Sequence, residues 1–413
     1  MTVMEEMGKR AKAAARVLAV SGEKKSQGLL HAAKALREQA EAIIRENERD
    51  VKAAKENGMS EAMQDRLLLT KERIEDMAAA VEAVAGEPDP VGRVLSGETR
   101  PNGLKIEKVT VPLGVIGIIF ESRPNVTSDA AALCIRAGNV VILRGGKEAF
   151  HSNRVIVETL RAAFGESGLP EDILQLVEDT TRQSATDLMN LTDYLDVLIP
   201  RGGAGLIQAV KTTAKVPVIE TGVGNCHVYV DEYADIDMAA DIIYNAKTSR
   251  PSVCNTIETV LVHEKTAEAM LPLMKKRLDE KQVEIRGDVR TAEILPGTVP
   301  AEESDWYEEF LSYTLAVKVV KTMEEALSHI AKYSSRHSEA IITRDNARAE
   351  QFLNEVDSAA VYVNASTRFT DGGQFGLGAE IGISTQKLHA RGPMGLGELT
   401  SYKYLIRGSG QIR

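Results

Sequence analysis

The stretch Val115-Ile116-Gly117-Ile118-Ile119-Phe120 is short, uncharged and rich in β-branched residues, and it runs directly into Glu121-Ser122-Arg123-Pro124-Asn125. Its length and composition are typical of a buried strand. Polar groups that follow such a strand are a favoured position for functional residues. Similar runs recur after residue 104 and alternate with longer helical stretches. This alternation predicts parallel sheets with helices on both faces, an α/β fold.

The other predicted strands share this short, β-branched character. They comprise 106–111, 140–143, 173–177, 195–199, 217–219, 227–230, 257–263, 315–320, 340–342 and 360–363, with predicted helices at 152–167, 236–248 and 266–279. The first 85 residues instead carry apolar residues at helical spacing, and Pro88 and Pro90 end that helical region. Near the other end, a glycine-dense stretch at 372–397 precedes an alternating run at 400–406, which predicts a terminal strand.

The charge balance narrows the classes of function. The chain has 413 residues, with 50 Lys and Arg against 60 Asp and Glu, and a net charge of −10. A nucleic-acid-binding protein needs a basic face, and docking to anionic lipid needs a cationic one, so we expect no nucleic acid and no membrane partner. The longest uncharged apolar run, 109–120, is far shorter than the roughly 20 residues that span a bilayer. With no targeting segment expected either, the sequence predicts a cytoplasmic protein.

The chain has three cysteines, Cys134, Cys226 and Cys254. This sparse, odd number argues against a disulfide framework and favours a reducing compartment. Cys134 lies in an alanine-rich helical stretch and is typical of a core residue, whereas Cys226 has no evident role. Cys254 lies in the loop 250–256, where a cation and polar neighbours precede a predicted strand. Because only the thiolate attacks, a nucleophilic cysteine needs such surroundings, and Cys254 is the candidate nucleophile.

Two further loops suit an anionic ligand. The predicted strand 195–199 leads into a turn with Gly202 and Gly203 and then a helix, a geometry that presents backbone N–H groups to a phosphate. The predicted strand 140–143 leads into Arg144-Gly145-Gly146-Lys147, at the end of a strand where α/β sheets bind ligands. Neither the G-x-G-x-x-G nor the Walker motif is present. No histidine or cysteine pair has zinc spacing, so we expect no metal.

The order of these loops resembles the aldehyde dehydrogenase superfamily over about 105–406. Within it, four stretches resemble the branch of acyl-phosphate reductases that acts on L-glutamyl 5-phosphate. They are 117–125, 218–227, 250–256 and 389–395. The resemblance implies NADPH-dependent reduction of L-glutamyl 5-phosphate to L-glutamate 5-semialdehyde, with release of phosphate, through a cysteine thioester in proline biosynthesis.

The same resemblance implies roles for individual residues. Cys254 falls on the nucleophile, and Glu309 falls near the carboxylate that holds the nicotinamide ribose. Asn125 is the candidate oxyanion donor if the loop shifts, because an ungapped alignment places Arg123 at that position. Glu220, which follows a short predicted strand, falls on the base that activates water in hydrolytic relatives. Reduction of an acyl phosphate needs no water, so Glu220 is implied to tune the thiol or guide the cofactor.

The resemblance also implies cofactor and substrate contacts. Arg144 falls where the family has a lysine on the adenosine ribose, and Gly202 and Gly203 fall on the turn for the pyrophosphate. Lys147 stands where NAD-preferring relatives often have a glutamate, and a cation there favours NADP because it can pair with the 2′-phosphate. The implied substrate contacts, to the phosphate or the glutamyl carboxylate, are Arg123, Asn364, His389 and Arg391.

The implied architecture is aldehyde-dehydrogenase-like, with two parallel-sheet α/β domains and a small β arm. We expect a discontinuous NADP-binding domain at 1–101 and 122–225, a catalytic domain at 226–362, and an arm at 102–121 and 380–413 that forms a homodimer or homotetramer. A glutamate 5-kinase is the implied protein partner. Two alternatives stay open: a CoA-acylating aldehyde dehydrogenase, and a non-catalytic binding protein that keeps the fold.

Overall fold

The run that opens the first sheet is β3 (Val115–Phe120), and all of its residues are buried. It lies inside a four-stranded parallel sheet with the order β5-β4-β3-β6. Its neighbours are β4 (Val140–Gly145) and β6 (Val197–Arg201), and the short β5 (Leu174–Leu176) pairs with β4. Because the strands are parallel, the loops after β3, β4 and β6 all leave from the same edge of the sheet.

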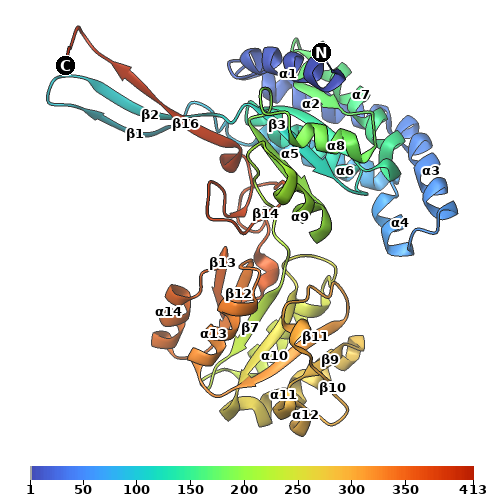
Figure 1. Ribbon diagram of the computed structural model, residues 1–413, viewed down its shortest axis with the longest axis vertical. Helices are drawn as coiled ribbons and strands as arrows, with labels where there is room; N and C mark the ends of the chain where they lie inside the picture. Colours follow the sequence, from blue (N-terminus) through green and yellow to red (C-terminus); the bar gives the residue numbers. More distant parts are fainter. Residues whose placement is uncertain (1) are drawn as a thin grey trace. The chain divides into compact units, whose positions relative to one another are not determined.

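This sheet belongs to the first of two units in the computed structural model, which describes residues 2–413 (Figure 1). Unit 1 comprises the chain up to Thr221 together with Gly376–Gly382 and Met394–Arg413. Unit 2 comprises Gly222–Phe375 and Ile383–Pro393. No helix within residues 2–413 is long and apolar enough to cross a membrane.

Helices surround the sheet of unit 1 (Figure 1). They are α1 (Val3–Leu18), α2 (Lys24–Glu38), α3 (Ala40–Glu56), α4 (Glu61–Leu67), α5 (Lys71–Gly86), α6 (Asn125–Arg136), α7 (Phe150–Glu166), α8 (Arg182–Met189) and α9 (Ala204–Thr213). Leu29, Leu36 and Ile43, apolar positions of the predicted N-terminal helices, are fully buried. The helix α2 packs against α5 and α7, so the N-terminal helices form part of the core of unit 1.

A second, antiparallel sheet of unit 1 joins distant parts of the chain. Its order is β1-β2-β16, with β1 (Val94–Thr99), β2 (Lys105–Pro112) and β16 (Thr400–Arg407), so the predicted terminal strand is present. All of β1 is exposed. The expected arm, 102–121 with 380–413, differs from this arrangement in three respects. Its segment Ile383–Pro393 belongs to unit 2. The fully buried β3 lies in the parallel sheet, and β1, expected in the cofactor domain, pairs with β2.

Unit 2 is built on a seven-stranded sheet in which every pair of neighbours is parallel. In spatial order the strands are β10 (Val299–Pro300), β9 (Glu284–Gly287), β11 (Thr314–Val320), β8 (Ile257–His263), β7 (Cys226–Val230), β12 (Ser338–Ile342) and β13 (Ala360–Val363). The helices are α10 (Ile236–Thr248), α11 (Glu264–Leu278), α12 (Val289–Ile294), α13 (Met323–Tyr333) and α14 (Asn346–Glu355). The α/β class with parallel sheets predicted from the sequence is therefore confirmed.

Alternate residues of β7 point to two different cores. Val228 and Val230 pack in a cluster with α10 and α11, whereas Tyr229 packs with residues of α13 and α14. This two-sided burial explains why β7 reads as a continuous apolar run rather than an alternating one. A separate two-stranded ladder, β14 (Ile383–Ser384) with β15 (Gly392–Pro393), belongs to the 383–393 segment of the unit.

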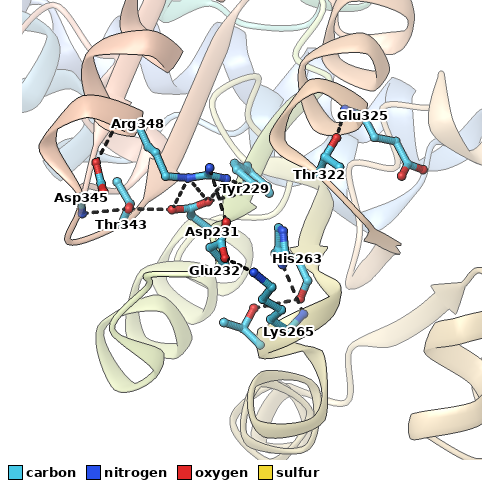
Figure 2. Close-up of polar contacts among 11 residues, drawn as sticks. Tyr229, Asp231, Glu232, His263, Lys265, Thr322, Glu325, Thr343, Asp345 and Arg348 are labelled. Carbon is cyan, nitrogen blue, oxygen red and sulfur yellow. Dashed lines mark hydrogen bonds and ion pairs between the residues drawn. The ribbon is translucent and has the colours of Figure 1, made fainter.

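The carboxyl ends of β7 and β12 are closed by a buried ion pair (Figure 2). Chain order reverses between these strands, because β8 lies on one side of β7 and β12 on the other, and α/β sheets usually bind ligands at such a point. Here Asp231, fully buried after β7, accepts hydrogen bonds from Arg348 Nε at 2.7 and 2.9 Å and from Thr343 Oγ1 at 2.8 Å. Tyr229 donates to the same carboxylate at 3.1 Å. These side chains occupy the point where α/β sheets usually bind ligands. We infer that this edge of the sheet stabilises unit 2 and is not its ligand-binding site.

Replacing Arg348 with Met should destabilise unit 2 by about 3–5 kcal/mol, because it leaves the buried Asp231 carboxylate without its cation. Urea unfolding followed by the fluorescence of Trp306, the single tryptophan of the chain, reports on this unit. The control is Arg344→Met, whose side chain is 71% exposed and pairs with Asp235, and it should cost less than about 1 kcal/mol.

The effect of Arg348→Met should also depend on pH. Burial acts to raise the pKa of Asp231, but hydrogen bonds from Arg348 and Thr343 outweigh it and leave the pKa below its ordinary value. The stabilisation is therefore present above the ordinary pKa of about 3.9 and is lost as the pH falls through the lower folded value. A difference between wild type and variant that stayed constant from pH 7 down to pH 2 would contradict this account.

Candidate active site

The loop 250–256 between α10 and β8 presents one cysteine. Thr256 Oγ1 donates to the carbonyl of Arg250 at 2.7 Å, and the Thr256 N–H donates to the carbonyl of Val253 at 3.1 Å, so the loop closes on itself. Cys254 within it is partly exposed, whereas Cys134 and Cys226 are buried. Burial raises the pKa of both buried thiols, which keeps them protonated at neutral pH. Of the three cysteines, Cys254 has the accessibility that a nucleophile needs.

The segment Gly224-Asn225-Cys226 packs directly on this loop. A Cβ added at Gly224 would lie 1.7 Å from the Cys254 carbonyl oxygen, so only glycine fits. The Cys226 thiol donates to the same carbonyl at 3.2 Å. Asn225 Nδ2 donates to the backbone carbonyl of Trp306 at 2.7 Å and ties this segment to the chain before Glu309. Cys226, which had no role in the sequence analysis, thus holds the backbone of the nucleophile.

Glu309 lies against the same segment. Its Oε1 accepts a hydrogen bond from the Gly224 N–H at 2.7 Å, and burial raises the pKa of its carboxyl. The structure therefore links Glu309 to Cys254 through Gly224. One oxygen of the Glu309 carboxylate is thus bound by the protein.

The residues expected to bind substrate are not all placed near the nucleophile. Cys254 precedes β8 and Asn364 follows β13, so in a parallel sheet they belong to opposite edges. The Asn364 side chain binds the backbone of Thr343 in both directions, at 3.0 and 2.9 Å, and clamps two strand ends. The structure thus gives Asn364 a structural task and does not bring it to Cys254.

Arg391 and His389 lie in the 383–393 segment of unit 2. Arg391 Nη1 pairs with Asp357 Oδ1 at 2.9 Å. Lys387 and Arg391 together hold the pKa of Asp357 below its ordinary value. His389 has φ of 70° and is exposed. Arg391 therefore shares its carboxylate partner with Lys387, and its buried Nε has no hydrogen-bond partner among the described residues.

In unit 1, Arg144 and Lys147 lie at the end of β4 as expected. Arg144 Nη2 donates to the carbonyls of Thr180 and Thr181 at 2.7 and 2.8 Å, but its buried Nε has no protein partner. A buried donor without a partner fits a ligand oxygen, such as that of a ribose. Lys147 is exposed at the start of a short 3-10 turn. Arg144 and Lys147 are three residues apart, and the charged group of Lys147 is exposed to solvent.

The glycine turn before α9 already holds an anionic group. The Gly203 N–H donates to Glu121 Oε2 at 2.9 Å, and a Cβ added at Gly202 would lie 2.4 Å from the same oxygen. The carboxylate stands in for an anion at the N-terminus of a helix, which favours negative charge. The turn therefore has the backbone donors that a pyrophosphate requires, and Glu121 must move if one binds there.

The loop after β3 contains a residue with a strained backbone conformation, and hydrogen bonds hold that residue in place. Ser122 has φ of 35°, and both its N–H and its hydroxyl donate to Glu148 Oε1, at 2.9 and 2.6 Å. Asn125, the first residue of α6, donates to Asp129 Oδ2 at 2.9 Å. Burial raises the pKa of Asp129 to about 6, against the opposing effects of Asn125 and Arg201.

The two remaining candidates also lie in unit 1. Glu220 is paired with Lys211 at 3.1 Å, and Arg123 is partly buried between β3 and α6. Unit 1 therefore carries Arg123, Asn125 and Glu220, whereas unit 2 carries Cys254 and Glu309.

Comparison with known proteins agrees with this geometry. The model of the aldehyde dehydrogenase family matches residues 2–296. The chain belongs to the aldehyde dehydrogenase family. It is 58% identical to the gamma-glutamyl phosphate reductase of Moorella thermoacetica over 411 residues, 99% of this chain and 98% of that protein. It is 59% identical to the enzyme of the same name from Clostridium perfringens, over 98% of each chain.

The solved structures give the same result. The crystal structure of gamma-glutamyl phosphate reductase from Thermotoga maritima is 48% identical and covers 100% of both chains with a TM-score of 0.98. The resemblance inferred from the sequence is thereby confirmed. As a member of this family, the chain has its partly exposed cysteine on a loop that a glycine and a second thiol hold in place.

Replacing Gly224 with Ala should lower dehydrogenase activity by 100-fold or more. The added methyl group cannot share space with the Cys254 carbonyl, and a displacement of about 1 Å in a catalytic group costs on the order of 10²-fold. The rate follows from nicotinamide absorbance, and circular dichroism checks the fold. Gly86→Ala is the control, since no atom lies within 4 Å of its added Cβ. Activity of Gly224→Ala within threefold of wild type would refute the tight packing.

Proposed function

We propose that this protein reduces L-glutamyl 5-phosphate to L-glutamate 5-semialdehyde, with NADPH as the reductant and release of phosphate, in proline biosynthesis. The observation that carries the proposal is the placement of Cys254 as a partly exposed thiol on a loop fixed by Gly224 and Cys226. Relatives that are 58–59% identical over nearly the whole chain bear the name of this reductase.

The mechanism uses Cys254 as a covalent nucleophile. Its thiolate attacks the acyl carbon, and the bond from that carbon to the phosphate oxygen breaks, which leaves a thioester and free phosphate. NADPH, when bound, would supply the hydride for reduction of the thioester carbon. The resulting thiohemiacetal oxyanion is stabilised by backbone N–H groups of the 250–256 loop, with Asn125 as a further donor. Cleavage of the carbon–sulfur bond then releases the aldehyde and restores the thiolate.

Glu220 has no water to activate in this direction, because hydrolysis of the thioester would waste the substrate. We propose that it tunes the thiol or guides the cofactor, and its carboxylate pairs with Lys211 at 3.1 Å. The residues that would hold the cofactor are Arg144, Gly202 and Gly203 of unit 1 and Glu309 of unit 2. Their fit rests on the unpartnered Arg144 Nε and on the backbone donor at Gly203 that now binds a carboxylate.

We further propose a cytoplasmic homodimer or homotetramer. The sheet β1-β2-β16 carries exposed Tyr402, Tyr404 and Ile406 on alternate positions of β16, so they share one face. An apolar face on an edge strand is suited to a second copy of the chain.

A glutamate 5-kinase is proposed as a partner that hands over the labile acyl phosphate. A CoA-acylating activity is the alternative within the family, and it predicts dependence on CoA in place of phosphate.

The reaction run in reverse tests the proposed function. Glutamate semialdehyde, phosphate and NADP should give NADPH absorbance that depends strictly on phosphate, because only phosphate can release the thioester as an acyl phosphate. Cys254→Ala should retain less than about 1% of the rate, since the covalent step is lost. A rate that persists without phosphate would indicate a hydrolytic dehydrogenase, and a requirement for CoA would indicate the alternative.

Cofactor preference should depend on Lys147. Replacing it with Glu should raise KM for NADP by about 10-fold or more and improve the use of NAD, because a carboxylate repels the 2′-phosphate and can accept from both ribose hydroxyls. The control Lys215→Glu changes another exposed lysine of unit 1 and should leave both KM values unchanged. An unchanged ratio of kcat/KM for the two cofactors in Lys147→Glu would remove Lys147 from the cofactor site.

A further inference from the structure

One arginine that the sequence analysis did not single out lies at the nucleophile loop. Arg368 is in the short 3-10 turn Thr367–Phe369 that follows β13. Its Nε donates to Ser249 Oγ at 3.0 Å, and its Nη1 contacts Asn255 Oδ1. Ser249 immediately precedes the loop 250–256, and Asn255 immediately follows Cys254. The guanidinium of Arg368 therefore contacts both sides of the loop that carries the thiol.

The position of Arg368 is fixed by its surroundings. Asn255 Nδ2 donates to the carbonyls of Arg368 and Thr370 at 3.3 and 3.0 Å, and Thr367 Oγ1 donates to the Asn255 carbonyl at 2.7 Å. Thr370 Oγ1 is in turn 2.6 Å from the hydroxyl of Tyr362. The guanidinium is thus held in place before any ligand binds, which lowers the entropic cost of recognition.

Arg368 also lacks a carboxylate partner. Burial lowers its pKa, and the nearby charge of Arg250 acts in the same direction. Within residues 2–413, neither Arg250 nor Arg368 forms an ion pair with Asp or Glu. Asp371 acts on Arg368 from a distance, but its carboxylate accepts from the N–H groups of Gly373 and Gln374. Because neither side chain has a carboxylate partner, an anion that approaches the guanidinium of Arg368 is attracted by both cations.

Most other arginines of unit 2 differ in this respect, although Arg336 also forms no ion pair with the described residues. Those paired with carboxylates are Arg277, Arg286, Arg290, Arg344, Arg348 and Arg391. Arg391, one of the residues expected to bind substrate, is paired with Asp357, a carboxylate that Lys387 shares. The uncompensated positive charge beside Cys254 is therefore that of Arg368 and Arg250.

We propose that Arg368, assisted by Arg250, binds the phosphoryl group of the acyl phosphate beside Cys254. The proposal rests on the proposed function, because it assigns the leaving group of that reaction. When the bond between the acyl carbon and the phosphate oxygen breaks, the oxygen keeps the electron pair, and the guanidinium donates to the oxyanion that forms. The planar fork of an arginine matches a phosphate, and hydrogen bonds to charged groups are the strong ones.

The test uses Arg368→Gln, Arg250→Gln and the charge-conserving Arg368→Lys, with Arg290→Gln as the control. Arg290 pairs with Glu268 and Glu293 at the surface and touches no residue of the site. In the reverse reaction, Arg368→Gln should raise KM for inorganic phosphate by 10-fold to 100-fold while KM for NADP stays within twofold. Arg368→Lys should recover part of the loss. Arg250→Gln should raise the same KM by a smaller factor, because Arg250 is exposed.

A second measurement needs no turnover. Inorganic phosphate should slow the labelling of Cys254 by iodoacetamide in wild type and in Arg290→Gln, and chloride at equal ionic strength should not. This protection should be lost in Arg368→Gln. Because Arg368 also supports the loop, Arg250→Gln, whose side chain is exposed, provides the variant whose fold is least at risk. Weakened protection in Arg250→Gln with an unchanged melting temperature supports the subsite.

Three results would overturn the proposal. The first is an unchanged KM for phosphate and unchanged protection in Arg368→Gln. The second is a rise in KM for glutamate semialdehyde instead, which would assign Arg368 to the glutamyl carboxylate. The third is a shift in the pH profile of Cys254 labelling with no change in phosphate binding, which would make Arg368 a group that only tunes the thiol. Protection by phosphate without phosphate-dependent NADPH formation would leave the subsite standing and refute the proposed function.

Discussion

The surroundings of the nucleophile depend on one close contact, between the backbone of Gly224 and the carbonyl of Cys254. Because no side chain intervenes, the segment that follows can place the Cys226 thiol 3.2 Å from the same carbonyl. The Gly224 N–H is then free to bind Glu309 at 2.7 Å, which brings a carboxylate to the nucleophile from a distant part of the chain. One missing Cβ thus allows three segments of unit 2 to meet. A buried thiol suits this place because its raised pKa keeps it a donor rather than a competing nucleophile.

The two edges of the sheet in unit 2 have different roles. At the carboxyl edge, where an open α/β sheet usually binds ligands, the buried pair of Asp231 and Arg348 occupies the reversal point (Figure 2). Asn364 adds a clamp between neighbouring strand ends at that edge. At the amino edge, the loops before β7 and β8 meet around Cys254. The rigid contacts at the carboxyl edge hold the strands in place, and this also fixes where the strands begin at the amino edge. Cys254, whose backbone is held by contacts with neighbouring segments, needs strands that are fixed in this way.

The sequence predicts best those elements whose pattern is local. β8 and α10 have the bounds predicted, because each is a continuous apolar or helically spaced run. The polar, exposed β1 was not predicted, since its only partner, β2, is found by tertiary pairing. The predicted strand 217–219 makes just one bridge, from Val218 to Leu198. The same limit applies to the candidate site. The sequence of the loop 250–256 is enough to predict Cys254 as the nucleophile. The position of Arg368 next to that loop depends on how the chain folds back after β13, and no periodic sequence pattern indicates it.

The local charge at the candidate site depends on which side chains form ion pairs, and not on the total number of charged residues in the chain. The chain carries a net charge of −10, yet Arg250 in the nucleophile loop and Arg368 beside that loop form no ion pair within residues 2–413. Arg391, which the resemblance placed at the substrate, is paired with Asp357 at 2.9 Å, and Lys387 shares that carboxylate. An unpaired guanidinium held beside a thiol stabilises two anions in turn, the thiolate before attack and the phosphate after it. That succession is a reason to keep Arg368 unpaired, because a carboxylate partner would compete with the substrate for the guanidinium.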